Sequence, residues 1–314
     1  MKVGVVGATG YAGSELCRWV LEHPSLELAV AVSQRHAGAP LARALPGLAG
    51  CTELTCSAWD PEALGRCDVV CFAVPHGEAA PLVRELGDAG PVILDLSADH
   101  RHAPGWTYGL AEWAAADIAR SRRIAVPGCF ATAIELSVAP FVGAITGPVC
   151  VAAATGSTGS GVTPSAGTHH PERFANFKAY KVLEHQHVPE IRAALAALGQ
   201  DVSLAFVPSS APLDRGIFAT CFVPVAAGVD PAERLADAYR GAPLVRIRSG
   251  SPEVRHVRGT AFADLSAQAA PGLAVVLCAI DNLGKGAATQ AVQCLNLVSD
   301  LPVHTGLLRA ACLP

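Results

Sequence analysis

The chain has 314 residues, of which 51% are hydrophobic and 16% are charged, and its formal net charge is −4. This length predicts about two domains, and the composition provides ample apolar material for packed cores. No strip of Lys and Arg is present, which argues against nucleic acid as a partner. No window approaches the ~20 apolar residues of a membrane span, and the first residues lack the long apolar region of a signal peptide. We therefore expect a cytoplasmic protein with no membrane partner.

Eleven cysteines are scattered along the chain, and none of their spacings is Cys-x-x-Cys. They therefore predict neither a zinc ribbon nor a thioredoxin-type pair. Most lie in apolar stretches, where buried free thiols are the simplest interpretation. This interpretation covers Cys67, Cys71, Cys150, Cys221, Cys278 and Cys294.

The first part of the chain alternates between strand-like and helix-like segments. Residues 3–6 are an apolar strand, residues 12–23 carry an apolar stripe of helical spacing that stops at Pro24, and residues 26–33 are again strand-like. This succession predicts a βαβ unit. Further apolar strands are expected at 68–75 and 92–97. Continuous apolar strands alternating with helices indicate a doubly wound parallel sheet over the first ~125 residues.

After residue 150 the pattern changes. The strand-like segments 217–226, 244–249 and 273–280 have fewer helices between them, which favours an α+β domain with a mixed or antiparallel sheet. The last segment, 284–300, has apolar residues at helical spacing and predicts a helix.

Three glycines follow the first predicted strand and open the first predicted helix: Gly7, Gly10 and Gly13. Without side chains they permit a tight turn and the close approach of a pyrophosphate to the amides at the helix start. The pattern indicates a nucleotide site. A plain turn between a strand and a helix is the alternative.

The residues after the second predicted strand bear on the choice of nucleotide. NAD-binding proteins usually carry an Asp or Glu there for the ribose 2′-hydroxyl, whereas a 2′-phosphate needs a cation. Here the stretch AVSQRHAG supplies Ser33 and Arg35 and no acid, so we expect NADP(H). A solvated surface charge is the other interpretation of Arg35.

The segment IAVPGCFATA, residues 124–133, places Cys129 after a Pro-Gly pair and before a run with Ile134, Val138 and Phe141 on one helical stripe. Unpaired amides and the dipole at a helix N-terminus favour the thiolate, which is the nucleophilic form of cysteine. A buried structural cysteine is the alternative. However, Cys129 is the only cysteine that follows a Pro-Gly turn and starts a helix beyond a parallel strand, where open α/β sheets bind their ligands. We therefore predict that Cys129 is a nucleophile.

Four histidines lie between residues 169 and 187, and the last two, His185 and His187, bracket a single residue. They have three interpretations: an acid/base with a pKa near neutrality, a His-x-His metal site, and surface or capping histidines. A thiol nucleophile elsewhere in the chain favours the acid/base, and we expect no metal.

With these motifs in view, the chain resembles the N-acetyl-γ-glutamyl-phosphate reductase family, which is related to the aspartate-semialdehyde dehydrogenases. The matching segments run in family order from end to end. They are GATGYAGSEL (7–16), PHG (75–77), LDLSADHR (94–101), PGCFATA (127–133), GSTGSG (156–161), FKAYKVLEHQHVPEI (177–191), RGIFAT (215–220) and DNLGKGAATQAVQCLN (281–296).

The resemblance implies a Rossmann domain of residues 1–128 plus 286–314, whose last helix returns to it, and a catalytic and dimerisation domain of residues 129–285. It implies Cys129 as the nucleophile and an acid/base from His185 or His187, with His187 favoured. The substrate-binding residues that it implies are Arg101, Ser157 and Arg215. The cofactor-binding residues are Gly7, Thr9, Gly10, Tyr11, Ala12, Gly13, Ser33, Arg35, Asn282 and Gly286.

The activity implied is the NADPH-dependent reduction of N-acetyl-γ-glutamyl phosphate, a small-molecule substrate, to the semialdehyde through a cysteine thioester, a step of arginine biosynthesis. The resemblance also implies a homo-oligomer, a dimer or a tetramer. An alternative is the same chemistry on an aminoadipyl or glutamyl phosphate linked to an acidic carrier protein. Alternatives of another class are a metal-dependent hydrolase built on His185 and His187, and a non-catalytic NADP sensor.

Overall fold

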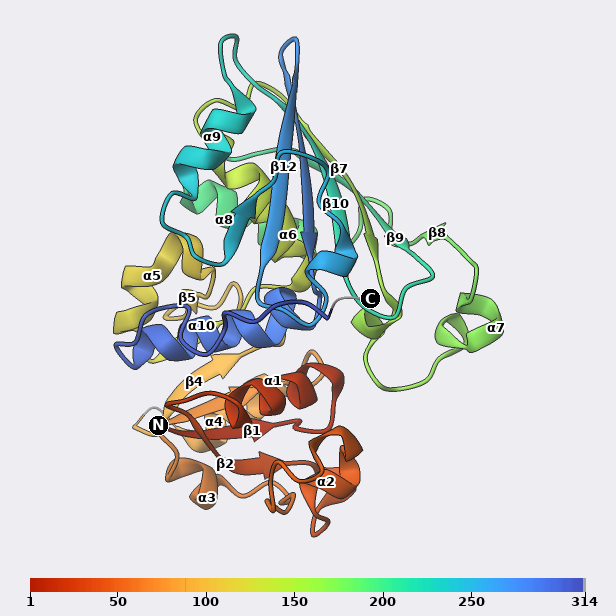
Figure 1. Ribbon diagram of the computed structural model, residues 1–314. Coiled ribbons are helices and arrows are strands. Elements are labelled where there is room, and N and C mark those ends of the chain that lie inside the picture. Colours follow the sequence, from red (N-terminus) through yellow and green to blue (C-terminus); the bar gives the residue numbers. More distant parts are fainter. Residues whose placement is uncertain (88, 313–314) are drawn as a thin grey trace. The chain divides into compact units, whose positions relative to one another are not determined.

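The computed structural model describes residues 1–87 and 89–312, which form two compact units (Figure 1). The first unit contains Met1–Gly128 and Ala287–Leu308, and the second contains Cys129–Gly286 together with residues 309–312. The chain thus leaves the first unit at Cys129 and returns to it after Gly286. Among the described residues, no helix is long and apolar enough to cross a membrane.

The first unit is built on a six-stranded sheet in the order β2-β1-β3-β4-β6-β5, with every neighbouring pair parallel. All four residues of β3 are buried, so both faces of the sheet are covered there, and its unbroken apolar sequence follows from this. The predicted doubly wound parallel sheet is confirmed. Its strands are β1 (Lys2–Val6), β2 (Glu27–Val32), β3 (Val69–Phe72), β4 (Val92–Asp95), β5 (Thr107–Tyr108) and β6 (Arg123–Ala125).

The helices of the first unit include one from the end of the chain. Helix α1 buries Leu16, Trp19 and Val20, three positions of the stripe predicted for residues 12–23. Helix α10 packs against α1 and α5, so the segment after Gly286 is part of this unit. The α-helices are α1 (Tyr11–Leu21), α2 (Leu41–Ala44), α3 (Pro61–Gly65), α4 (Ala79–Leu86), α5 (Ala111–Arg120) and α10 (Thr289–Val298).

The segment 284–300 differs from the single α-helix predicted for it. Its first turn, Gly284–Ala288, is π-helical, and α10 begins only at Thr289. The N–H of Gly286 donates to the carbonyl oxygen of Asp281, five residues back, at 2.9 Å. Two glycines in one turn weaken the α-helical preference, and π turns are frequent at functional sites.

The second unit is built on a seven-stranded mixed sheet in the order β11-β12-β13-β10-β7-β9-β8. The pairs β11–β12 and β7–β9 are parallel, and the other neighbours are antiparallel. This confirms the α+β domain with a mixed sheet that was predicted after residue 150. The strands are β7 (Val149–Thr155), β8 (Lys178–Ala179), β9 (Leu204–Ser210), β10 (Ile217–Pro224), β11 (Val245–Ile247), β12 (Ala263–Ala270) and β13 (Leu273–Ile280).

Helices cover one face of the mixed sheet (Figure 1). Helix α6 packs against β10, β13 and α8, and α9 packs against β12 and β13. The inward residues of β10, such as Ile217 and Ala219, are completely buried. The α-helices of this unit are α6 (Cys129–Val138), α7 (His170–Arg173), α8 (His187–Ala197) and α9 (Pro231–Ala238).

The other face of the mixed sheet is apolar and partly exposed. Phe222 of β10 is 40% exposed and pairs in register with Cys150 of β7, which is also exposed. The prediction that Cys150 is buried was therefore wrong. The apolar run VCVAAAT alternates between the two faces of the sheet, and position 150 points away from the helices. The predicted burial of Cys67, Cys71, Cys221, Cys278 and Cys294 is confirmed.

Candidate active site

The glycine loop of the first unit is shaped by close backbone packing. The N–H groups of Gly7 and Ala8 both donate to the carbonyl oxygen of Val32, at the end of β2, at 3.0 Å. Gly7 has φ +83°, and a Cβ there would overlap the carbonyl of Ala73. A Cβ on Gly13 would overlap the carbonyl of Gly7. Only glycine fits these two positions, and this lets the first turn of α1 lie directly against the loop.

Gly10 differs from the other two glycines of the loop. It precedes α1 with φ −73°, and a Cβ there would meet the carbonyl oxygens of Gly7 at 3.4 Å and Ala73 at 3.8 Å, which are ordinary contact distances. The protein's own packing therefore does not exclude a side chain at Gly10. Beside it, Tyr11 is 38% exposed and Ala12 is half-buried.

The loop is hydrogen-bonded to the end of β2, the segment from which the sequence analysis predicted the nucleotide. The hydroxyls of Thr9 and Ser33 are hydrogen-bonded at 2.7 Å, and Ser33 is buried. Arg35 follows in an exposed 3₁₀ turn, Gln34–His36. The end of β2 thus presents a hydroxyl and an exposed guanidinium and no carboxylate.

The PHG and LDLSADHR motifs, which are about 20 residues apart, meet through Asp99. Its carboxylate accepts hydrogen bonds from the backbone N–H groups of Gly77 at 2.6 Å, Ala79 at 3.0 Å and Ala80 at 3.1 Å. Burial raises the pKa of Asp99, but these three donors and Ser97 outweigh it and leave the pKa below its ordinary value. These hydrogen bonds hold the Asp99 side chain at the start of α4 and favour its ionised form.

Arg101 is half-buried in the same turn. Its Nε donates to the carbonyl oxygen of Val126 and its Nη2 to that of Leu96, both at 3.1 Å. Nearby, the Nδ1 of His100 lies 2.6 Å from the buried carboxylate of Asp95. These contacts hold the Arg101 side chain against the strand end that leads to the Pro-Gly turn.

Cys129 is the first residue of α6, the position expected from its sequence context. It is partly exposed, whereas the nine residues that follow it in the helix are buried. Gly286 lies against it, since a Cβ on Gly286 would be 2.7 Å from the Cβ of Cys129. The two motifs PGCFATA and DNLGKGAATQ thus meet at the thiol.

His185 and His187 are both 5% exposed, so neither is a surface histidine. His187 is the first residue of α8, and its backbone N–H donates to the Nδ1 of His185 at 3.2 Å. Burial lowers the pKa of His185 to about 4, and the charge of Lys181 adds to the effect. His185 is therefore neutral at neutral pH.

Three aromatic side chains that the sequence did not single out surround the histidines. Phe130, next to Cys129 on α6, meets the rings of both His185 and His187 edge to face, with centroids 5.5 and 6.2 Å away. The ring centroids of Phe206 and Tyr180 lie 5.4 and 5.8 Å from that of His185. Burial, and then the charge of Cys129, raise the pKa of Tyr180 well above its ordinary value. Tyr180 lies in the quoted motif FKAYKVLEHQHVPEI, so the signal for it was present.

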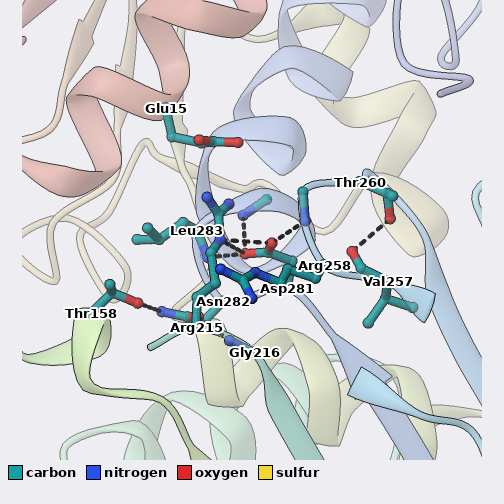
Figure 2. Close-up of polar contacts among 12 residues, drawn as sticks. Glu15, Thr158, Arg215, Gly216, Val257, Arg258, Thr260, Asp281, Asn282 and Leu283 are labelled. Carbon is teal, nitrogen blue, oxygen red and sulfur yellow. Dashed lines mark hydrogen bonds and ion pairs between the residues drawn. The ribbon is translucent and has the colours of Figure 1, made fainter. Parts of the chain in front are cut away.

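Asp281 and Asn282, at the end of β13, organise several loops (Figure 2). The completely buried Asp281 accepts from the Nε of Arg215, at 2.8 Å from the nearer oxygen, and from the N–H of Gly259 at 2.5 Å. Asn282 accepts from the N–H of Gly216 at 2.6 Å and donates to Thr158 at 3.0 Å. The predicted residues Arg215 and Asn282 are thereby brought into one network.

Ser157 lies in a 3₁₀ turn, Ser157–Ser160, directly after β7. Its N–H donates to the carbonyl oxygen of Leu213 at 2.8 Å, and the side chain is half-buried. Gly156 has no space for a Cβ, which would be 2.6 Å from the backbone of Arg215. The turn therefore packs closely against the loop that carries Arg215.

The predicted site residues divide between the two units. The first unit holds Gly7, Thr9, Gly10, Tyr11, Ala12, Gly13, Ser33, Arg35 and Arg101, and the second holds Cys129, Ser157, His185, His187, Arg215, Asn282 and Gly286. Within the described residues, no group of three or more His, Cys, Asp and Glu side chains is placed to hold a metal ion.

Two family models match the chain. One, described as semialdehyde dehydrogenase, NAD binding domain, matches residues 2–121. The other, described as semialdehyde dehydrogenase, dimerisation domain, matches residues 129–282. The boundary between the two matches falls at the Pro-Gly-Cys turn.

Similar proteins match from end to end. The N-acetyl-γ-glutamyl-phosphate reductase of Acidothermus cellulolyticus is 40% identical, over 100% of this chain and 99% of its own. That of Pseudomonas entomophila is 41% identical, over 100% of both chains. Among solved structures, aspartate semialdehyde dehydrogenase II from Vibrio cholerae has a TM-score of 0.77 at 16% identity, over 95% of this chain and 98% of its own. This structural likeness establishes the fold.

Proposed function

The chain belongs to the N-acetyl-γ-glutamyl-phosphate reductase family, within the semialdehyde dehydrogenases, and on this premise we propose that it reduces N-acetyl-γ-glutamyl phosphate to N-acetylglutamate semialdehyde with NADPH. One observation carries the proposal: a partly exposed thiol starts a buried helix beside two buried histidines, in a chain 40% identical to such reductases over its whole length.

NADP(H) is the cofactor, and the first unit fits it. The glycine loop leaves room at Gly10, where packing does not require a glycine, and the amides at the start of α1 are suited to a pyrophosphate. We assign the loop residues 7 and 9–13 to the pyrophosphate side, and Ser33 and Arg35 to the 2′-phosphate. Ser33 is already hydrogen-bonded to Thr9 of the loop. We assign Asn282 and Gly286 to the nicotinamide side, where Gly286 is pressed against Cys129.

Cys129 is proposed as the nucleophile. Its thiolate attacks the acyl carbon, a C–S bond forms, and the C–O bond to phosphate breaks as phosphate leaves with the electron pair. Amides at the start of α6 stabilise both the thiolate and the oxyanion that develops, an effect commonly worth ~10²–10³ in rate for each donor. When bound, NADPH supplies the hydride that reduces the thioester carbonyl. The C–S bond then breaks, which releases the semialdehyde and restores the thiolate.

We assign the acid/base role to His187 and a positioning role to His185. His185 accepts the N–H of His187 and stays neutral down to about pH 4, so its charge does not change near neutrality. His187 is the first residue of α8, and its ring contacts Phe130, as the ring of His185 also does. His187 holds the proton that the substrate oxygen takes in the tetrahedral intermediate, and receives it back when the C–S bond breaks.

Arg215 and Ser157 are proposed to face the substrate from the loops after β9 and β7. Arg215 is fixed by Asp281, which is anchored in turn by backbone N–H groups of two loops. Such a fixed guanidinium is suited to an anionic substrate group. Arg101, held against the strand end before the Pro-Gly turn, is proposed as a third substrate residue.

A second copy of the chain is proposed to cover the exposed face of the mixed sheet, giving a dimer or a tetramer. The face carries Phe222, Cys150 and half-buried apolar neighbours, and it belongs to the segment matched by a dimerisation domain. Light scattering tests this: the wild type should have at least twice the mass of one chain, and Phe222→Asp should lower it. A wild-type mass of one chain would contradict it.

The reverse reaction tests the function. Purified protein is given N-acetylglutamate semialdehyde, NADP and phosphate, and absorbance at 340 nm is followed before and after treatment with iodoacetamide. We expect turnover that depends on phosphate and is lost on alkylation. Phosphate-independent turnover would show that water takes the acyl group from the thioester, and would contradict the acyl phosphate as the substrate of the forward reaction. Absence of turnover with NADP still bound would contradict this substrate and direct attention to the carrier-linked acyl phosphates or to a sensor.

A further inference from the structure

Arg173 lacks the carboxylate partner that three other arginines of the second unit have. Arg215, Arg246 and Arg258 are each ion-paired with an aspartate, namely Asp281, Asp264 and Asp214. Arg173, at the end of α7, donates from its Nη2 to the carbonyl oxygen of Thr155 at 3.1 Å. Among the described residues no carboxylate lies within ion-pair distance of it.

The guanidinium of Arg173 is also partly withdrawn from water. The residue is half-buried, and its Nε is shielded from solvent with no hydrogen-bond partner in the described chain. Burial lowers its pKa and outweighs the opposing effect of Tyr180, so the cationic form is only partly compensated. A buried charge without a counterion is costly, and an anionic ligand that brings the missing charge removes that cost.

Two routes connect Arg173 to Cys129 within the second unit. On one side, its charge acts on Tyr180, whose ring packs on His185 and whose ionisation responds to the charge of Cys129. On the other side, Thr155 is followed by the turn in which Thr158 accepts a hydrogen bond from Asn282. The segment that begins with Asn282 also contains Gly286, which lies against Cys129. Arg173 is therefore linked, through Thr155 and the turn that follows it, to the segment that carries Asn282 and Gly286.

We propose that Arg173 is an anion subsite for the substrate, which binds an oxyanion, either a carboxylate or a phosphate, beside the Cys129 thiol. Its partly desolvated guanidinium offers fixed donors to a planar carboxylate or to a phosphoryl group. The identity of the anion rests on the proposed function. The existence of the subsite does not, because it can be tested with a reagent that is not a substrate.

The probe is a pair of alkylating reagents of similar size, iodoacetate, which is anionic, and iodoacetamide, which is neutral. With either one, the thiolate sulfur displaces iodide and forms a C–S bond. The rate at Cys129 is followed by mass spectrometry of its peptide, because other cysteines, such as Cys51 and Cys150, are exposed. The ratio of the two rates measures how strongly the surroundings of the thiol attract an anion.

We expect Arg173→Gln to lower the iodoacetate to iodoacetamide ratio about fivefold, because the subsite loses its cation in partly desolvated surroundings. Arg173→Lys keeps the charge and should retain most of the ratio. The matched control is Arg234→Gln, which removes an exposed arginine on α9 with the same change in net charge. An unchanged ratio in Arg173→Gln, or an equal fall in Arg234→Gln, would overturn the subsite. Thermal unfolding checks that each variant is folded.

The reverse reaction then identifies the anion. In Arg173→Gln, a KM raised about tenfold or more for the semialdehyde, with an unchanged KM for phosphate, assigns the subsite to the substrate carboxylate. The opposite split assigns it to phosphate. If neither KM changes, the substrate subsite is overturned. If the wild type does not turn over, the proposed function fails while the alkylation ratio still decides whether the subsite exists.

Discussion

The backbone N–H of His187 donates a hydrogen bond to the imidazole Nδ1 of His185, 3.2 Å away. A neutral His185 that accepts at Nδ1 carries its proton on Nε2, so this single contact fixes its tautomer. Because His187 is also the first residue of α8, the same contact holds the start of that helix. Two histidines that look alike in the sequence thus occupy different positions in the fold, which is the basis of the different roles that we propose for them.

The first prediction separates these two roles by kinetics. His187→Gln should lower kcat by ~10²–10⁴ and remove one limb of the pH–rate profile, because the acid/base is lost. His185→Gln should lower kcat less and keep the shape of the profile, because glutamine can still accept the N–H of His187. The exposed His169→Gln is the control and should behave as the wild type. A lost limb in His185→Gln, with His187→Gln unaffected, would reverse the assignment.

The second prediction concerns stability in acid. The pKa of His185 is lowered from 6.5 to about 4 in the folded protein, so below pH 6.5 the unfolded chain binds a proton that the folded chain does not. This contribution to stability is complete above about pH 6.5 and is lost as the pH falls toward 4. Between pH 7.5 and pH 5 it amounts to about 2 kcal/mol.

Urea unfolding at these two pH values measures it. His185→Gln removes the titrating group, so its stability should fall by about 2 kcal/mol less than that of the wild type over this interval. The same pH dependence in both proteins would contradict the lowered pKa.

The sequence predicted the fold class because its signals are local. Unbroken apolar strands between helices indicated a covered parallel sheet, and β3 is buried at every position. Buried cysteines were less certain, since Cys150 lies in an apolar strand but on the exposed face. The strand order β11-β12-β13-β10-β7-β9-β8 could not be predicted, because pairings between strands distant in the sequence leave no local pattern.

The site was predicted in part for the same reason. Cys129, His185 and His187 carry motif signals, whereas no local pattern predicts the contact of Arg173 with Thr155, which forms only through the course of its loop. That loop contains Ala175 and Leu183 with φ of 54° and 63°, a conformation that sequence reasoning assigns to glycine. The surroundings of His185 and His187 could not be predicted either. Phe130 meets both rings, and burial together with Lys181 lowers the pKa of His185, only in the folded chain.

The third prediction uses two glycines of the glycine loop, Gly10 and Gly13, which differ in their surroundings. Gly10→Ala should leave stability nearly unchanged, because the added Cβ meets two carbonyl oxygens at the ordinary contact distances of 3.4 and 3.8 Å. It should nevertheless weaken NADPH binding tenfold or more if the pyrophosphate approaches there. Gly13→Ala should destabilise the first unit by several kcal/mol, because its Cβ overlaps the carbonyl of Gly7. Fluorescence titration and thermal unfolding measure the two effects, and tight NADPH binding by Gly10→Ala would place the pyrophosphate elsewhere.

The fourth prediction concerns the contact between Gly286 and Cys129. Gly286→Ala adds a methyl group 2.7 Å from the Cβ of Cys129 and should displace the thiol. A misplacement of about 1 Å at a reacting atom costs ~10² in rate, so kcat should fall by roughly that factor. Gly250→Ala is the control, since a Cβ there meets nothing within 4 Å. Wild-type kcat in a folded Gly286→Ala protein would show that the thiol does not need its present position.

The fifth prediction removes the nucleophile itself. Cys129→Ser keeps the size of the side chain but replaces a thiol that a helix start can ionise by a hydroxyl that stays protonated. Turnover should fall at least about a thousandfold, because the covalent step is lost, while NADPH binding, which we assign to the first unit, should persist. Cys51→Ser changes an exposed cysteine outside the proposed site and outside the proposed dimer face, and it should retain activity. A combined loss of turnover and of NADPH binding would indicate a folding defect, so the unfolding temperature is measured alongside. Retained turnover in a folded Cys129→Ser protein would leave the thioester route without its nucleophile.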